Sequence, residues 1–184
     1  MGKNRFFVMI TLAIAVSQMP VYADEPGREF TAEAVVNSSE GRRTMLVTLV
    51  ANRFTSVEEA QNLAGVLEKG GQGALMSVLK GRSDGQLRLG ALQMPIALVV
   101  AEPAGRGYRY LFLTPRRIRV DEREFGEESL NYPFGIAEFE TDSFGRGEGR
   151  LHVAAALQID ADGYVEIEDY DGVDGTIERL KQVR

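Results

Sequence analysis

The stretch Thr55–Gly81 (TSVEEAQNLAGVLEKGGQGALMSVLKG) is the one convincing helical region of this sequence. On both sides of it, apolar and polar residues alternate as they do in half-buried strands. An amphipathic helix has to bury its apolar face against another element, and the flanking strands offer only a sheet. We therefore expect the helical region to cover a β-sheet.

Within that stretch, the pattern predicts two helical segments separated by glycines. Ser56 with Glu59 can form a capping box at the start, as can the pair one residue earlier. The glycines at 70–71 end the first segment, because glycine adopts a positive φ without a steric clash. The expected element is a helical hairpin with one apolar face, which ends at Gly81. Its apolar residues are Val57, Ala60, Leu63, Ala64 and Leu67, followed by Ala74, Leu75, Val78 and Leu79.

The remaining sequence predicts about eight strands joined by short links. Short links favour antiparallel neighbours, and many such strands favour a sheet that is strongly bent or closed into a barrel or sandwich. The charged segment Pro115–Asn131 is expected to cross the outside of the fold, with a short strand at Arg117–Val120 as an option. Thr176–Val183 is expected to be an edge strand. The other predicted strands are Glu29–Val36, Thr44–Phe54, Gln86–Ala91, Met94–Val100, Tyr108–Thr114, Pro133–Thr141, Arg150–Ile159 and Tyr164–Tyr170.

Residues 1–23 have the three-part pattern of a secretory signal peptide. A basic start precedes the apolar run Phe6–Val16, and Val21 and Ala23 occupy the two positions that a signal peptidase reads. This run is too short to cross a bilayer and no later stretch is long enough, so we expect no membrane span after cleavage. Residues 24–184 are expected to form a single domain in the periplasm or outside the cell.

Composition narrows the possible partners. The chain contains no cysteine, which excludes disulfides and thiolate metal sites and, for an exported protein, fits a bacterium. Its 27 acidic residues outnumber its 21 basic residues, which gives a net charge of −6. This balance opposes binding to a phosphate backbone, so nucleic acid is not expected as a partner.

His152 is the only histidine, so a Ser-His-Asp site would have to use it. It shares a strand face with Arg150 and Gln158, opposite the apolar face, and the sequence has no Gly-x-Ser-x-Gly motif. We therefore expect a histidine that faces solvent. Zinc sites built on several histidines or cysteines are excluded by composition.

Carboxylates offer a second route to catalysis. Four glutamates occupy the polar faces of two predicted strands, and they would cluster if those strands were close in the sheet. Paired carboxylates can hydrolyse glycosides, but exposed glutamates also keep sheets soluble, and the chain has no tryptophan to stack on sugars. These residues are Glu138, Glu140, Glu166 and Glu168.

The aspartates near Gly163 partly match a calcium-binding loop. Strands flank this segment on both sides, and Asp162-Gly163 is a strong signal for a hairpin turn. We therefore expect a turn here, and no metal or cofactor.

Several segments together resemble a group of short, exported, uncharacterised bacterial proteins. They are EFTAEAVV, RTMLVTLVANRFTSVEEAQNLAGVLEKGGQGALMSVL, YPFGIAEFETDSFGRGEGRL and DGYVEIEDY. The members of that group have a signal peptide followed by this order of strand, helix and hairpins. The resemblance implies bacterial export and a single domain, and it implies no activity, ligand or catalytic residue.

These observations predict an α+β domain in which a helical hairpin packs on a mainly antiparallel, curved or barrel-like sheet. The leading hypothesis is a non-enzymatic binding or interaction domain, for a small apolar ligand between hairpin and sheet or for a protein partner. The alternative is a hydrolase that uses carboxylates or His152. The residues expected to contact a ligand are Leu63, Leu67, Leu75, Leu79, Tyr108, Tyr110 and Phe112.

Overall fold

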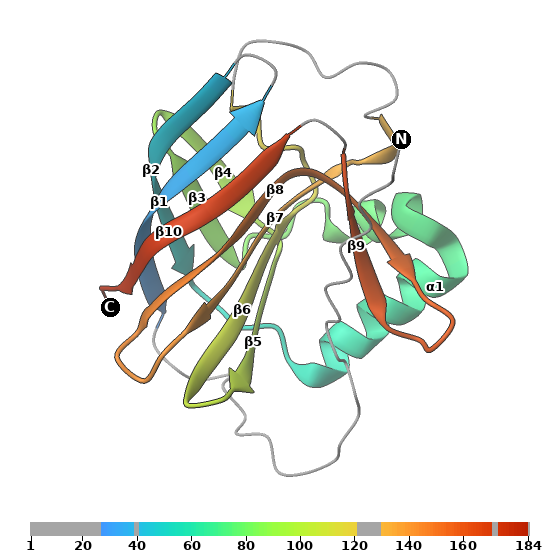
Figure 1. Ribbon diagram of the computed structural model, residues 1–184. Coiled ribbons are helices and arrows are strands. Elements are labelled where there is room, and N and C mark those ends of the chain that lie inside the picture. Colours follow the sequence, from blue (N-terminus) through green and yellow to red (C-terminus); the bar gives the residue numbers. More distant parts are fainter. Residues whose placement is uncertain (1–26, 39–40, 121–129, 171–172, 184) are drawn as a thin grey trace.

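The computed structural model describes residues 27–38, 41–120, 130–170 and 173–183 (Figure 1). In these ranges, ten strands form one antiparallel sheet, and a single α-helix, α1 (Val57–Leu79), lies against one side of it. The strands are β1 (Arg28–Ser38), β2 (Gly41–Ala51), β3 (Gly85–Leu89), β4 (Leu92–Ile96), β5 (Leu98–Ala104), β6 (Gly107–Thr114), β7 (Phe134–Thr141), β8 (Arg146–Ile159), β9 (Val165–Asp169) and β10 (Asp174–Gln182).

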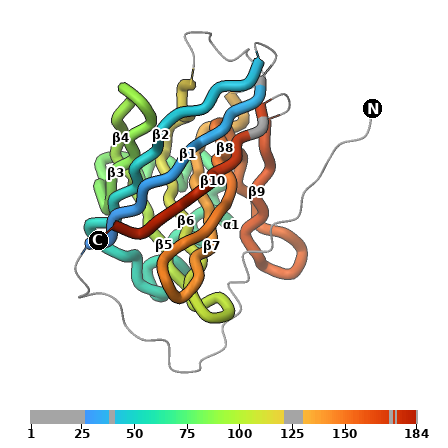
Figure 2. Tube along the Cα trace, turned by 60° about the vertical axis from the view of Figure 1, so that its left-hand side comes forward, coloured from blue at the N-terminus to red at the C-terminus, as the bar shows by residue number. Residues whose placement is uncertain are grey.

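The sheet curls into a nearly closed barrel (Figure 2). Its strand order is β4-β3-β2-β1-β10-β8-β7-β6-β5, and β9 pairs with β8 outside this path. The two end strands, β4 and β5, are separated only by Ala97, whose N–H donates to the carbonyl of Leu113 on β6 at 2.9 Å. The chain thus passes directly from one edge of the sheet to the other. This architecture confirms the prediction of a barrel-like antiparallel sheet.

Three details of the strands differ from the sequence prediction. The run Met94–Val100 is two strands rather than one, because the chain changes partners at Ala97. Strand β10 is not at an edge, since it pairs with both β1 and β8. Residues 117–120 form no strand, although Ile118 is buried and donates to the carbonyl of Val153. The rest of the predicted charged crossing, residues 121–129, lies outside the described residues.

Aromatic side chains fill the inside of the barrel. Phe30, Tyr110, Phe112 and Phe139 are each at most 2% exposed, and their ring centroids lie 4.8–6.2 Å apart. These separations are typical of aromatic pairs in direct contact. Aliphatic residues from these strands and from others complete this interior cluster, namely Ala32, Ala34, Val36, Val47, Leu49, Ala51, Leu87, Leu89, Met94, Ile96, Val99, Ala137, Leu151, Val153, Ile177 and Leu180.

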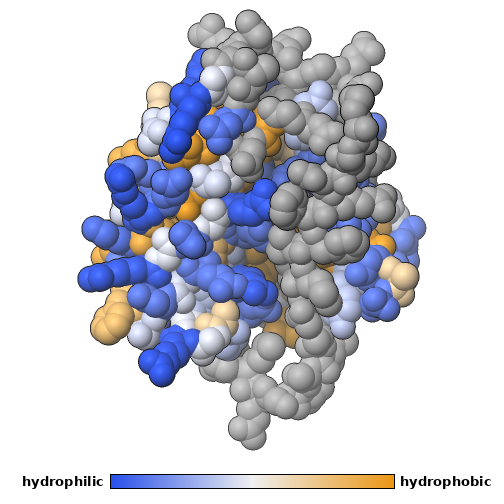
Figure 3. Space-filling model, in the orientation of Figure 1, coloured by the Kyte–Doolittle hydropathy of each residue, from blue (hydrophilic) through white to orange (hydrophobic). Residues whose placement is uncertain are grey.

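The outer face of the barrel differs from one side to the other. Over β1, β2 and β10 it is largely hydrophilic (Figure 3), and Arg179 pairs there with Glu33 at 2.8 Å. On the opposite side, the outward-facing residues of β5–β8 are mostly apolar, and α1 packs against them. The helix therefore covers the outside of the barrel and does not plug its interior.

The helix begins as predicted, but it is not a hairpin. Ser56 is the N-cap, and its hydroxyl accepts the N–H of Glu59 at 3.2 Å. At Gly71 the backbone leaves the helical region, with φ 66° and ψ −171°, and then resumes it. The predicted helical hairpin is therefore wrong, because one non-helical residue bends α1 without reversing its direction. Leu67 before the bend and Leu75 after it are both buried against the same face of the sheet.

Strand β8 belongs to two layers of the molecule. Its first half pairs with β10 in the barrel wall, and its second half pairs with β9 beside α1. An irregularity in its pairing with β7 inserts an extra residue between His152 and Ala155. The alternation of faces shifts at this bulge. Leu151 and Val153 therefore point into the barrel, whereas Ala155 and Leu157 join the leucines of α1.

Candidate functional site

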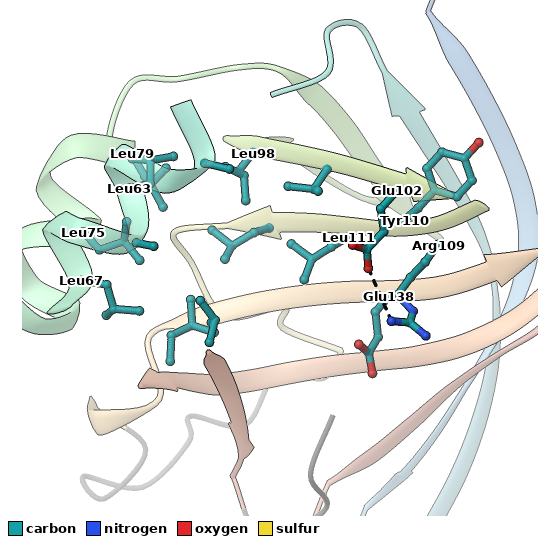
Figure 4. Close-up of a pocket in the computed structure, with 16 residues that line it drawn as sticks. Leu63, Leu67, Leu75, Leu79, Leu98, Glu102, Arg109, Tyr110, Leu111 and Glu138 are labelled. Atoms are coloured by element: carbon teal, nitrogen blue, oxygen red, sulfur yellow. Dashed lines mark hydrogen bonds and ion pairs between the residues drawn. The ribbon is translucent and has the colours of Figure 1, made fainter. Parts of the chain in front are cut away.

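A pocket of about 100 Å³ lies between α1 and the outer face of the sheet (Figure 4). The helix contributes one wall, and β5–β9 contribute the other. Figure 4 shows the helix leucines at one end of the pocket and charged side chains at the other. The lining residues are Ala60, Leu63, Ala64, Leu67, Leu75, Leu79, Leu98, Val100, Glu102, Arg109, Tyr110, Leu111, Leu113, Glu138, Leu157 and Val165.

The helical wall combines large and small side chains. Leu63 and Leu67 are buried, while Ala60 and Ala64, which also line the pocket, are only half-buried. An alanine side chain reaches less far from the helix than a leucine side chain, and so it leaves space in front of the sheet. Opposite them, Val100 and Leu111 are also half-buried. The pocket thus has apolar walls that the protein does not fill itself.

The sheet wall changes from apolar to charged along the β5–β6 hairpin. The cross-strand pairs on this face are, in order, Leu98 with Leu113, Val100 with Leu111, and Glu102 with Arg109. Side chains on one face of a sheet are two residues apart, so each pair lies one step further from the helix leucines. The pocket is therefore amphipathic along its length.

At the charged end, Arg109 bridges two glutamates unequally. Its Nε lies 2.9 Å from Glu140, and its Nη1 lies 3.4 Å from Glu102. The contact with Glu102 is at the long limit for a hydrogen bond. Burial raises the pKa of the Glu102 carboxyl, and Arg109 offsets this only in part. Glu102 thus lies in a half-buried place beside a weakly bound counter-ion.

A buried histidine lies between two carboxylates next to the pocket. His152 is 4% exposed, its Nδ1 is 2.7 Å from Asp169 on β9, and its Nε2 is 3.2 Å from Glu138 on β7. Burial lowers the pKa of His152, but the hydrogen bonds to Asp169 and Glu138 outweigh it and raise the pKa to about 9. His152 is therefore an imidazolium at neutral pH, with both ring nitrogens donating.

This arrangement corrects the prediction that His152 faces solvent. Its strand face is the outer one, as expected, but β9 pairs alongside β8 and supplies Asp169. Both ring nitrogens are engaged by carboxylates, so neither has a free lone pair with which to take a proton from a substrate. Glu138 is also buried, at 8% exposure, rather than exposed on a polar face.

The other predicted carboxylates do not join this group. Glu140 is bound to Arg109, while Glu168 accepts hydrogen bonds from Tyr132 at 3.0 Å and Gln158 at 2.8 Å. Glu166 alternates with residues that face the core, so it lies with Glu168 on the other side of β9. The hydrolase alternative stays a prediction, and of its candidate residues only Glu138 and His152 are in contact.

The predicted ligand contacts divide between the two sides of the sheet. The four helix leucines, Leu63, Leu67, Leu75 and Leu79, come together and line the pocket. Phe112 and the ring of Tyr110 belong to the interior of the barrel, with Tyr108 packed beside them. At that end of the barrel, the guanidinium of Arg28 lies 5.1 Å from the ring of Tyr108 and hydrogen-bonds to the hydroxyl of Tyr110.

Sequence reasoning missed Glu102 and Arg109. The predicted hairpin around residues 103–107 contained the signal, because pairing its two strands places Glu102 opposite Arg109. Both residues then share a face with Leu111 rather than with the aromatic residues of β6.

Within the described residues, no group of histidines and carboxylates has the arrangement of a metal site. In the same part of the chain, α1 is too polar to span a membrane, and no other long helix occurs. Comparisons of the chain with protein-family models, curated proteins and solved structures found no match.

Proposed function

We propose that this protein is a binding protein that holds a small apolar ligand in the pocket between α1 and the outer face of the barrel. The observation that carries the proposal is the unfilled pocket with apolar walls, formed by the leucines of α1 and by Leu98, Val100 and Leu111. Apolar pockets with a few polar groups at fixed positions are the usual form of small-molecule sites.

The volume of the pocket limits the ligand. About 100 Å³ is less than the roughly 150 Å³ of an engineered cavity that binds benzene, and far below the roughly 300–1,000 Å³ of drug-sized sites. The closed part of the pocket therefore takes only a few carbon atoms of a ligand. A narrow aliphatic chain is compatible with this space, with its remaining atoms at the open, charged end.

Half-exposed apolar side chains also support binding. Val100 and Leu111 lie in the middle of a sheet face where α1 does not fully cover them. Burial of apolar surface by a ligand yields roughly 25 cal/mol per Å², so these side chains favour an apolar occupant. Because residues 1–23 are predicted to be a signal peptide, we expect such a binding protein in the periplasm or outside the cell.

Isothermal titration calorimetry with hexanol tests this function. The purified protein should bind hexanol at one saturable site. Ala64→Leu should weaken this binding strongly, because the larger side chain occupies the pocket. Asn62→Leu is the matched control, since it places the same side chain at an exposed position of α1 outside the lining. Absence of binding, or equal loss in both variants, would contradict the proposal and favour a protein-interaction role.

A further inference from the structure

We propose that the ligand of this pocket is a cationic amphiphile, a short aliphatic chain that ends in an ammonium group. The chain would lie among the leucines, and the ammonium group would lie at the charged end of the pocket, which Glu102 and Glu138 help to line. This inference rests on the proposed binding function and adds the chemistry of the head group.

Glu102 is the first carboxylate that lacks a full counter-charge. It lines the pocket, its side chain is 22% exposed, and among the described residues Arg109, at 3.4 Å, is its only ion-pair partner. Arg109 also binds Glu140 more closely, so its positive charge is shared. Burial in the pocket removes water from Glu102 without supplying a full counter-charge. An ammonium group beside it would supply that charge.

Glu138 is the second carboxylate. It lies directly across from Leu111 in the pairing of β6 and β7, where the apolar part of the pocket ends. One of its oxygens, Oε1, binds Nε2 of His152 at 3.2 Å. Among the residues that the structure describes, His152 is its only hydrogen-bond partner, so Oε2 is free to accept from a ligand.

The charges around this end of the sheet favour a cation over an anion. Arg150 lies across from Glu138, and Glu148 lies across from Glu140, so neighbouring strands contribute both signs. Among the described residues of this group, carboxylates nevertheless outnumber cations. The carboxylates are those of Glu102, Glu138, Glu140, Glu148 and Asp169, and the cations are Arg109, Arg150 and His152.

An ammonium head also matches the hydrogen-bonding needs of the site. It carries several N–H donors and no acceptor, so it can donate to a carboxylate without leaving an acceptor unpaired. A carboxylate head would instead add a negative charge beside Glu102 and Glu138, which is unfavourable in a partly desolvated place. An alcohol could donate to only one of them.

Titration calorimetry at low ionic strength with three ligands of equal chain length tests the inference. The probes are hexylammonium, hexanol and hexanoate. We expect hexylammonium to bind about tenfold more tightly than hexanol, which corresponds to about 1.4 kcal/mol, and hexanoate to bind most weakly. Glu102→Gln should remove the preference for hexylammonium over hexanol. Glu58→Gln is the control, because it removes the same charge at an exposed position outside the pocket.

The outcomes separate this inference from the proposed function. If hexanol binds and hexylammonium binds no better, or if hexanoate binds best, the head-group assignment is wrong while the apolar site stands. If none of the three ligands binds, both the proposed binding function and the head-group assignment are wrong. If Glu58→Gln weakens hexylammonium as much as Glu102→Gln does, the preference comes from net charge and not from Glu102.

Discussion

The two apolar clusters of this protein lie on opposite faces of the same strands, and they differ in how completely they are filled. Inside the barrel, four fully buried aromatic rings contact one another. Outside the barrel, leucines of α1 face the sheet across a pocket of about 100 Å³. In a closed barrel of this kind, the interior is the first place to look for a ligand, yet here the space lies under the helix.

Neighbouring residues of β6 show the physical basis of this difference. Phe112 points into the barrel and is fully buried, whereas Leu111 points toward α1 and is half-buried. Aromatic rings from several strands meet inside because the barrel wall surrounds them on all sides. A single bent helix cannot enclose the other face in the same way. Interior packing therefore provides stability, and the covered outer face provides the pocket.

The largest effect is expected inside the barrel. Phe112→Ala should lower the free energy of unfolding by about 3–5 kcal/mol, because it removes a ring from a close-packed cluster. Urea unfolding measured by circular dichroism checks this value. A loss below about 1 kcal/mol would mean that the interior is loosely packed, and the contrast between the two clusters would fail.

The next largest effect on stability is expected from His152, which lies between the pocket and β9. The pKa of His152 is raised to about 9 in the folded protein, whereas an unfolded histidine titrates near about 6.5. The protonated form is therefore favoured by folding. The stabilisation of the folded state by protonated His152 is complete below about pH 6.5 and is lost as the pH rises through about 9. We expect a decrease of about 2–3 kcal/mol in the free energy of unfolding over this range.

Urea unfolding at several pH values checks this prediction, with His152→Gln as the comparison. The variant should be less stable at pH 6 and should lose little further stability up to pH 9. Because His152 is the only histidine, an equal decrease in both proteins would assign the pH dependence to other groups.

A pair of glycine substitutions tests the bend that shapes α1 over the pocket. Gly71 has φ 66° and ψ −171°, a conformation nearly confined to glycine, so Gly71→Ala should cost about 1–3 kcal/mol. Gly73 has ordinary helical geometry and free space around it, so Gly73→Ala should add about 0.5–1 kcal/mol. Thermal unfolding compares the two variants. Similar shifts in both would show that the bend is not a requirement of the fold.

The smallest effect on stability is expected in the wall of the pocket. Leu111→Ala should cost only about 1 kcal/mol, since the side chain is half-buried. It should also enlarge the pocket and improve the affinity for octanol relative to hexanol, as measured by calorimetry. A loss as large as that of Phe112→Ala would mean that the outer cluster is as tightly packed as the interior.

The elements were predictable because their signals are local. Alternation located β1, β2, β6 and β7, and the side chain of Ser56 marked the start of α1. The bend at Gly71 was harder to predict, because a pair of glycines can either end a helix or bend it. Geometry decides between these outcomes, and the sequence around residues 70–71 is compatible with both.

The position of the site was harder to predict. Alternation separates Phe112 from Leu111, but both faces of β6 are apolar, so the pattern cannot tell which one α1 covers. His152 was placed on the correct face, yet its two carboxylate partners, Asp169 and Glu138, depend on how β9 and β7 pair with β8. Alternation predicts these strands, but it does not predict the extra residue between His152 and Ala155, which sets the local register.

The most direct test of the central claim is a titration of the methyl-labelled protein with hexanol, followed by nuclear magnetic resonance. The account predicts shifts for the methyl groups of Leu63, Leu67 and Leu111, and no change for Val47 and Leu49 inside the barrel. Shifts confined to the interior methyl groups, or no saturable shifts at all, would contradict a binding site between α1 and the outer face of the barrel.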